Sequence, residues 1–224
     1  DLKQGIKLDR LTGFLKRGPY CEYLNDAYKD RLNLKNPLEE YVGFFAVIGI
    51  DRLGMYNEAF GADTANRVIK AAGQRVEDLV RLPDSVVSRI GGDRFSVFIP
   101  NVTAEDVDAF ARQVLASFST APLITPQGPL RVSVSIGSAK FMTQRCSAMD
   151  ALTRAETAMQ VAKEEGRGCY VPYSKAAKER AHYQKLLQAG DDFLFALNGN
   201  RVVLAYQPIV DAKSEDIVLQ ECLV

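Results

Sequence analysis

The sequence of 224 residues contains no tryptophan, a single histidine (His182) and four cysteines that stand far apart. With one histidine and no Cys-x-x-Cys pair, it lacks the nitrogen and sulfur ligands from which proteins build a zinc site. Cysteines spaced in this way favour reduced thiols over a disulfide framework, which is typical of cytoplasmic proteins.

A surplus of charge of either sign is also missing, because 28 lysines and arginines balance 28 aspartates and glutamates. A neutral chain argues against salt-driven binding to a nucleic acid polymer or an anionic membrane. No apolar run approaches the roughly 20 residues of a membrane-spanning helix, and the charged first residues do not resemble a signal peptide. We therefore expect a cytoplasmic chain without membrane contact, although a longer parent protein can carry an anchor elsewhere.

The apolar residues that are present, 47% of the chain, suffice for a sizeable core. The length allows one full domain and a remainder. Because the chain opens on Asp1 and closes within an apolar run at Val224, we expect it to be part of a longer protein.

Several short runs have the composition of strands. The run Tyr41–Ile50 is continuously apolar, aromatic or β-branched, which predicts a strand buried on both faces. The runs Ser85–Ile90 and Phe95–Ile99 flank a glycine-rich tip and predict a β-hairpin. Apolar residues alternate with serines over Val132–Ile136, as in a half-buried strand, and Tyr170–Tyr173 is expected at a sheet edge.

Helical periodicity and capping signals predict helices between these strands. They are expected over Pro19–Leu34, over Leu53–Phe60, over a longer segment with Asp63 or Thr64 as N-cap, and after the capping boxes Thr103/Asp106 and Ser147/Asp150. A charged helical stretch after Ser174, a break at Gly190 and a short helix Asp192–Leu197 suggest a linker. The strands Val202–Val210 and Ile217–Val224 follow, and an isolated pair of strands is marginal in water.

Three places have residues suited to a phosphate or a cation. The tip Gly91-Gly92 lets backbone N–H groups approach a ligand, with the Asp93 carboxylate beside them. Lys163 and Arg167 lie four apart, on one helix face, and the buried strand runs out into Asp51. Each also has a structural explanation: a tight hairpin turn, complementation of the helix dipole, or an ordinary strand end.

Five short motifs follow one another in a recognisable order. They are Asp9 with Leu11-Thr12-Gly13, the pair Asn57-Glu58, the run Arg89-Ile90-Gly91-Gly92-Asp93-Arg94-Phe95, the run Val134-Ser135-Ile136-Gly137, and Ala162-Lys163 with Gly166-Arg167. Together they resemble the GGDEF domain of diguanylate cyclases, over roughly Asp9 to Pro172. The resemblance implies an α+β fold with a central, mostly antiparallel sheet wrapped by helices.

The end of the chain resembles the first strands of an EAL-type cyclic-di-GMP phosphodiesterase domain, in Leu204–Val210 and Gln220–Leu223. Glu221 matches the glutamate of the EAL signature, a metal ligand, but all other ligands of that site would lie beyond Val224. We therefore divide the chain into a lead-in (1–8), a degenerate GGDEF domain (9–172), a helical linker (173–199) and a truncated EAL start (200–224).

In the family, two GTP-loaded domains meet head to head and condense their GTP molecules into cyclic-di-GMP with the help of Mg²⁺ or Mn²⁺. The resemblance implies that an Asp at the end of the buried strand and the acidic third residue of the signature hold the metal. Here Gly49 replaces that Asp, Asp93 keeps the third position, and Arg94 replaces the fourth residue, normally Glu. Asp93 alone would form a weak metal site, so we do not expect catalysis. If the domain is nevertheless an active enzyme, Asp93 is the expected catalytic residue.

The nucleotide-contacting positions are better preserved. Asn57 matches the asparagine that contacts the guanine edge, whereas Asn66 replaces its partner Asp, which should weaken discrimination for guanine. Lys163 and Arg167 match the phosphate-contacting pair. We hypothesise that Arg94 replaces part of the lost metal charge at the Gly91-Gly92-Asp93 tip.

The family's product-inhibition motif, Arg-x-x-Asp, falls on Leu82 and Ser85 and is absent in register. Arg81 and Asp84 form such a motif displaced by one residue, and a surface turn around Pro83 is the favoured alternative.

The sequence thus predicts a catalytically degenerate GGDEF domain that binds GTP or a related nucleotide, or otherwise regulates an attached EAL phosphodiesterase, and that can form a homodimer. No cofactor is required for such a role. Two alternatives stay open: an active diguanylate cyclase, and an interaction or dimerisation module without a ligand.

Overall fold

The computed structural model describes residues 7–29, 41–126, 128–142, 146–199, 201–203, 205–214 and 216–223. The chain divides into two compact units, Asp1–Ala177 and Lys178–Val224, and the candidate site lies in the first. Within the described residues, no helix combines the length and the apolar character needed to cross a membrane. The four cysteines are unpaired thiols.

The first unit is built on a six-stranded sheet with the strand order β1-β3-β4-β2-β7-β8. The strands are β1 (Leu15–Lys16), β2 (Tyr41–Ile50), β3 (Val86–Gly91), β4 (Arg94–Pro100), β7 (Val134–Met142) and β8 (Tyr170–Pro172). The four inner strands pair antiparallel, and β1 and β8 at the edges run parallel to their neighbours. The predicted α+β fold, with a mostly antiparallel sheet and an edge strand near Tyr170, is confirmed.

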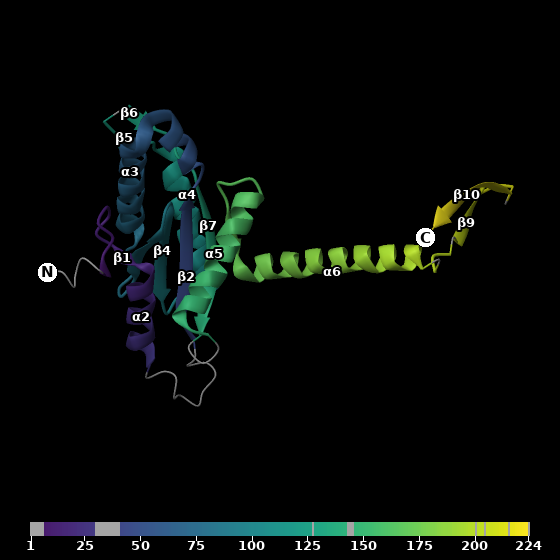
Figure 1. Ribbon diagram of the computed structural model, residues 1–224, viewed down its shortest axis with the longest axis horizontal. Coiled ribbons are helices and arrows are strands. Elements are labelled where there is room, and N and C mark those ends of the chain that lie inside the picture. The colour runs from purple at the N-terminus through teal and green to yellow at the C-terminus, as the bar shows by residue number, and fades with distance from the viewer. Residues whose placement is uncertain are drawn as a thin grey trace. The chain divides into compact units, whose positions relative to one another are not determined.

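Helices cover both faces of this sheet (Figure 1). They are α2 (Arg17–Tyr28), α3 (Leu53–Leu79), α4 (Ala104–Thr120) and α5 (Ala148–Glu164). One face of β2, with Ile48 and Ile50, packs in a core cluster with α3 and α4. The other face, with Phe45 and Val47, packs with α2 and α5. The central strand is therefore buried on both faces, as its continuous apolar run predicts.

The helix boundaries agree with the sequence signals where a cap is present. The boxes Thr103/Asp106 and Ser147/Asp150 both form and start α4 and α5. The two helices expected on either side of residue 61 are both present within α3, separated by a kink at Gly61, whose backbone is not helical (φ 82°, ψ 167°). The expected N-caps, Asp63 and Thr64, lie inside the second part, because the non-helical residue is Gly61, and the Thr64 hydroxyl donates to the carbonyl of Phe60.

The helix predicted over Pro19–Leu34 is α2, which begins at Arg17, and residues 30–40 lie outside the described residues. The small hairpin β5 (Leu123–Thr125) and β6 (Gly128–Leu130) was not predicted.

The strand predicted at Val132–Ile136 is present from Val134 onward, but the prediction that it is half-buried is wrong. Strand β7 begins at Val134, continues to Met142 and is buried on both faces, with Ser135 fully buried. Helix α5 packs so closely on β7 that a Cβ added to Gly137 would lie 2.0 Å from the backbone nitrogen of Met159. Gly137 is therefore required by the contact between strand and helix.

The last described elements are α6 (Tyr173–Asn198), β9 (Ala205–Val210) and β10 (Ile217–Leu223). Helix α6 continues through Gly190, so the break predicted there is wrong. A single glycine in a helix costs about 1 kcal/mol relative to alanine but does not by itself end it. Strands β9 and β10 pair antiparallel, as predicted.

Candidate functional site

The carboxyl end of β2 and the tip of the β3–β4 hairpin lie beside each other. Gly49 of β2 is aligned with Arg94 of β4, and the Ile50 N–H donates to the Asp93 carbonyl at 2.9 Å. The tip turns through Gly91 (φ 143°) and Gly92 (φ 50°), conformations that favour glycine. The two glycines are thus explained by the turn, which presents the Asp93 side chain next to the strand end.

Helix α5 brings a cation to the same place. The Lys163 ammonium donates to the Asp93 carboxylate at 2.6 Å and to the carbonyl of Ile50 at 3.2 Å. The Lys163 side chain is 17% exposed and that of Asp93 27% exposed. A charge-assisted bond of this length in a partly buried setting is a strong one. The structure therefore brings together Gly49, Asp93 and Lys163, three of the positions that the sequence singled out.

The residues at this centre do not fit a divalent metal ion. Mg²⁺ requires near-octahedral oxygen coordination and usually at least one free carboxylate. Here the Asp93 carboxylate is already paired with the ammonium of Lys163, and Gly49 supplies no side chain. Throughout the described part of the chain, no three His, Cys, Asp or Glu residues are grouped so that they could hold a metal.

Asp51, two residues beyond Gly49, is committed to a structural role. It is 2% exposed. Its carboxylate accepts hydrogen bonds from the Ser133 hydroxyl at 2.8 Å, the Ser135 hydroxyl at 2.7 Å and the Gly168 N–H at 3.2 Å. Asp51 therefore ties the end of β2 to β7 and to the loop after α5, so it is not free to take the place of the aspartate that the resemblance implies at position 49.

Arg94 is turned toward α5. Its guanidinium pairs with one oxygen of Glu156 at 2.9 Å, while Arg17 of α2 pairs with the other at 2.6 Å. The cation next to Asp93 is thus Lys163, whereas our hypothesis assigned the compensating charge to Arg94.

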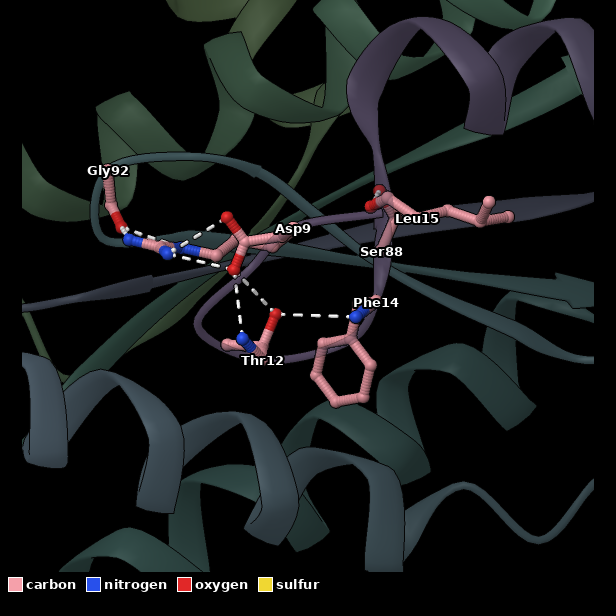
Figure 2. A network of polar contacts seen from close by, with 7 residues as sticks. Asp9, Thr12, Phe14, Leu15, Ser88 and Gly92 are labelled. Atoms are coloured by element: carbon pink, nitrogen blue, oxygen red, sulfur yellow. Dashed lines mark hydrogen bonds and ion pairs between the residues drawn. The ribbon is translucent and has the colours of Figure 1, made fainter. Parts of the chain in front are cut away.

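The hairpin tip is also held from the N-terminal side (Figure 2). Arg89 donates to both carboxylate oxygens of Asp9, at 3.0 and 3.2 Å, and to the carbonyl of Gly92, at 2.8 and 3.2 Å. Thr12 donates to the same carboxylate through its N–H and its hydroxyl, at 3.0 and 2.8 Å. Burial alone would raise the pKa of Asp9, but the bonds from Arg89 and Thr12 outweigh it and lower the pKa. The turn at Asp9–Thr12 therefore positions the tip.

The remaining nucleotide-binding candidates lie on the surface. Asn57 and Asn66 are exposed on the two parts of α3, on either side of the kink. Arg167 is exposed, in a left-handed conformation (φ 69°), in the loop that Asp51 anchors at Gly168. For these three side chains, the described part of the chain offers no hydrogen bond or ion pair.

Two candidate features stand apart from this centre. Arg81 and Asp84 are exposed in the turn before β3, and Asp84 has a left-handed φ of 61°. No ion pair joins them among the residues described. Glu221 is exposed on β10, opposite Gln207 of β9, in the second unit.

Sequence reasoning missed two contributors to the centre, Glu156 and the carbonyl of Ile50. A signal for Glu156 was available, because it precedes Lys163 by two helical turns and so shares its helix face. A backbone carbonyl leaves no trace in the residue types, so Ile50 could not be found in this way.

Comparison with known proteins agrees with the geometry. Residues 6–169 match the family described as diguanylate cyclase, GGDEF domain. The chain is 25% identical to the isolated GGDEF domain of TpbB (YfiN) from Pseudomonas aeruginosa, with a TM-score of 0.64, covering 74% of this chain and 94% of that one.

Longer relatives share the same region. The bifunctional diguanylate cyclase/cyclic di-GMP phosphodiesterase MucR of Pseudomonas aeruginosa is 29% identical over 80% of this chain and 26% of its own length. The cyclic di-GMP phosphodiesterase NbdA of the same species is 24% identical over 100% of this chain and 27% of its own length. The chain thus spans about a quarter of each of these relatives. By its sequence motifs, its sheet and its family match, this chain belongs to the GGDEF domain family.

Proposed function

We propose that this GGDEF domain does not condense GTP and instead serves as a nucleotide-binding regulatory module of a GGDEF–EAL protein in cyclic-di-GMP signalling. The observation that carries the proposal is the Lys163 ammonium seated on Asp93 beside Gly49. Phosphoryl transfer between nucleotides depends on divalent cations that offset charge on the phosphates. A centre whose remaining carboxylate is paired with an amine is poorly suited to that chemistry.

The nucleotide-binding part rests on the cations around the strand end. Lys163 is held in place by Asp93 and Ile50, and Arg167 is exposed on the neighbouring loop. Such a pair suits phosphate oxygens, which accept charge-assisted hydrogen bonds. Asn66 offers an amide where two acceptors would be needed to read guanine, so the site is expected to hold GTP and GDP with little preference over ATP.

The regulatory part rests on the second unit and on the relatives. Strands β9 and β10 contain the residues that resemble the start of an EAL domain, including Glu221. NbdA, which matches over the whole chain, is named a cyclic di-GMP phosphodiesterase. We therefore expect an attached phosphodiesterase to be the target of this domain.

A turnover assay tests the loss of catalysis. The chain is incubated with GTP and either Mg²⁺ or Mn²⁺, and cyclic-di-GMP is quantified by mass spectrometry, with Asp93→Ala as the control. We expect no product above background. Product that forms with the native chain and disappears in Asp93→Ala would establish an active cyclase instead.

Thermal unfolding in the presence of GTP, GDP, ATP and cyclic-di-GMP tests binding. A ligand at about 100 times its Kd stabilises the folded state by about 2.7 kcal/mol, which is a measurable rise in Tm. We expect a rise with the nucleotides. If none of the four ligands raises the Tm, the domain is a ligand-free interaction module.

Regulation is tested on the complete parent protein. We expect GTP to change the rate at which it hydrolyses cyclic-di-GMP, and Arg167→Ala to reduce that response. A hydrolysis rate that is the same with and without GTP would contradict the regulatory role.

A further inference from the structure

Gly49 makes room for the side chain of Lys163. A Cβ added at position 49 would lie 2.7 Å from the Met159 sulfur and 2.9 Å from Lys163 Cε, closer than real Cβ atoms approach other groups. The Lys163 side chain therefore passes directly over residue 49. Both atoms lie toward the ends of flexible side chains, so an aspartate at position 49 would require Met159 and Lys163 to leave the positions that they hold here.

The ammonium of Lys163 lies between two oxygens that would otherwise be free for a cation. It uses one N–H on Asp93 and one on the carbonyl of Ile50. An ammonium group has three N–H donors, and within the described residues the third has no protein partner. The group can therefore balance the charge of Asp93 and still donate to an anion.

One ion pair occupies the centre. The Asp93 carboxylate faces the ammonium of Lys163, the lysine that the resemblance matches to a phosphate-contacting position. Gly49 contributes no second carboxylate, so the acidic side chain that the signature keeps is already neutralised.

We propose that Lys163 is a built-in cation that takes the place of a divalent metal ion, so that the site binds nucleotide phosphates without metal. The metal-free binding rests on the function proposed above, whereas the replacement of the metal can be tested by itself. Arg94, bound to Glu156, is not needed for this role.

The first experiment measures Mn²⁺ binding without nucleotide, from the electron paramagnetic resonance signal of free Mn²⁺. We expect no site-specific binding by the native chain and at least tenfold tighter binding by the double variant Gly49→Asp/Lys163→Met. Lys70→Met, on the exposed surface of α3, is the control for loss of one positive charge. If the double variant is unfolded by circular dichroism, Lys163→Met alone is used and is expected to show the same direction of change.

Native protein that binds Mn²⁺ in a way that Asp93→Ala abolishes would overturn the proposal. So would a folded double variant whose Mn²⁺ binding equals that of the native chain, because Lys163 would then not be what excludes the metal.

The second experiment titrates the native chain with GTP by calorimetry, once with excess EDTA and once with Mg²⁺. We expect affinities that agree within about twofold, and a loss of about tenfold or more in Lys163→Met, as for a charge-assisted hydrogen bond. A tenfold weaker affinity in EDTA would refute metal-free binding. No GTP binding in either buffer would refute the proposed function, and the Mn²⁺ experiment would then decide the role of Lys163 independently.

Discussion

Asp51 is the residue whose removal tests the architecture of the site most directly. Its buried carboxylate accepts three hydrogen bonds, from Ser133, Ser135 and the Gly168 N–H. Hydrogen bonds to charged groups contribute about 1.5–3 kcal/mol each, but burial of the carboxylate costs several kcal/mol, which the variant Asp51→Ala no longer incurs. The variant also leaves the fully buried Ser135 hydroxyl without its acceptor, which costs about 1–3 kcal/mol.

We therefore expect Asp51→Ala to lower the free energy of unfolding by about 2–4 kcal/mol. Because the chain has no tryptophan, unfolding in urea is best followed by far-ultraviolet circular dichroism. Asp51→Asn keeps the shape and one acceptor oxygen, and serine hydroxyls can rotate to accept from its amide, so the expected loss is about 1 kcal/mol. The exposed Asp63→Ala serves as the surface control, with a change within about 0.5 kcal/mol.

The amide of Gly168 gives a second and more specific readout. Its N–H donates to Asp51, so its hydrogen exchange should accelerate in Asp51→Ala more than that of helical amides remote from the site. An unfolding free energy within 0.5 kcal/mol of the native value, together with unchanged exchange at Gly168, would refute the structural role of Asp51.

Three further perturbations have defined outcomes. Gly137→Ala places a methyl group against the backbone of α5 and should destabilise the domain by at least about 3 kcal/mol; an unchanged urea midpoint would contradict this contact. Because the pKa of Asp9 is lower in the folded than in the unfolded chain, its ionised form stabilises the fold above about pH 3.9. That contribution is lost as pH falls through the folded-state pKa, so the loss of stability on acidification should be smaller in Asp9→Asn; parallel pH profiles would argue against it. Burial raises the pKa of Cys21 to about 11, so iodoacetamide at pH 8 should alkylate the exposed Cys222 well before Cys21, as mass spectrometry can show; equal rates would count against the buried position.

The predictions of the fold succeeded where the signal is carried by neighbouring residues. The run Tyr41–Ile50 predicts a strand buried on both faces, and the box Thr103/Asp106 predicts the start of a helix. Both elements form as expected. The break predicted at Gly190 is wrong because a glycine weakens a helix but does not end it by itself. The prediction that Ser135 is exposed is wrong because its hydroxyl has a buried partner, Asp51, which the sequence pattern does not show.

The prediction of the site also succeeded for single positions and failed for the contacts between them. The positions Gly49, Asp93 and Lys163 were recognised from motifs along the chain, but the motifs did not indicate that the ammonium of Lys163 lies on Asp93. Arg94 was the expected substitute because it is adjacent in sequence. In three dimensions it faces Glu156, which α5 places on its side of the sheet.

The sequence by itself determined the family, because the motifs can be read from residue types and their spacing. The resemblance then implied the mostly antiparallel sheet and an aspartate at the position that Gly49 occupies. Only the tertiary structure decided which cation meets Asp93 and what Asp51 does. The partners in those contacts are 70 and 82 positions apart, so they become neighbours only when α5 and β7 pack against the end of β2. The charge around Asp93 and the space around Gly49 therefore depend on how these elements pack, which the sequence motifs do not show.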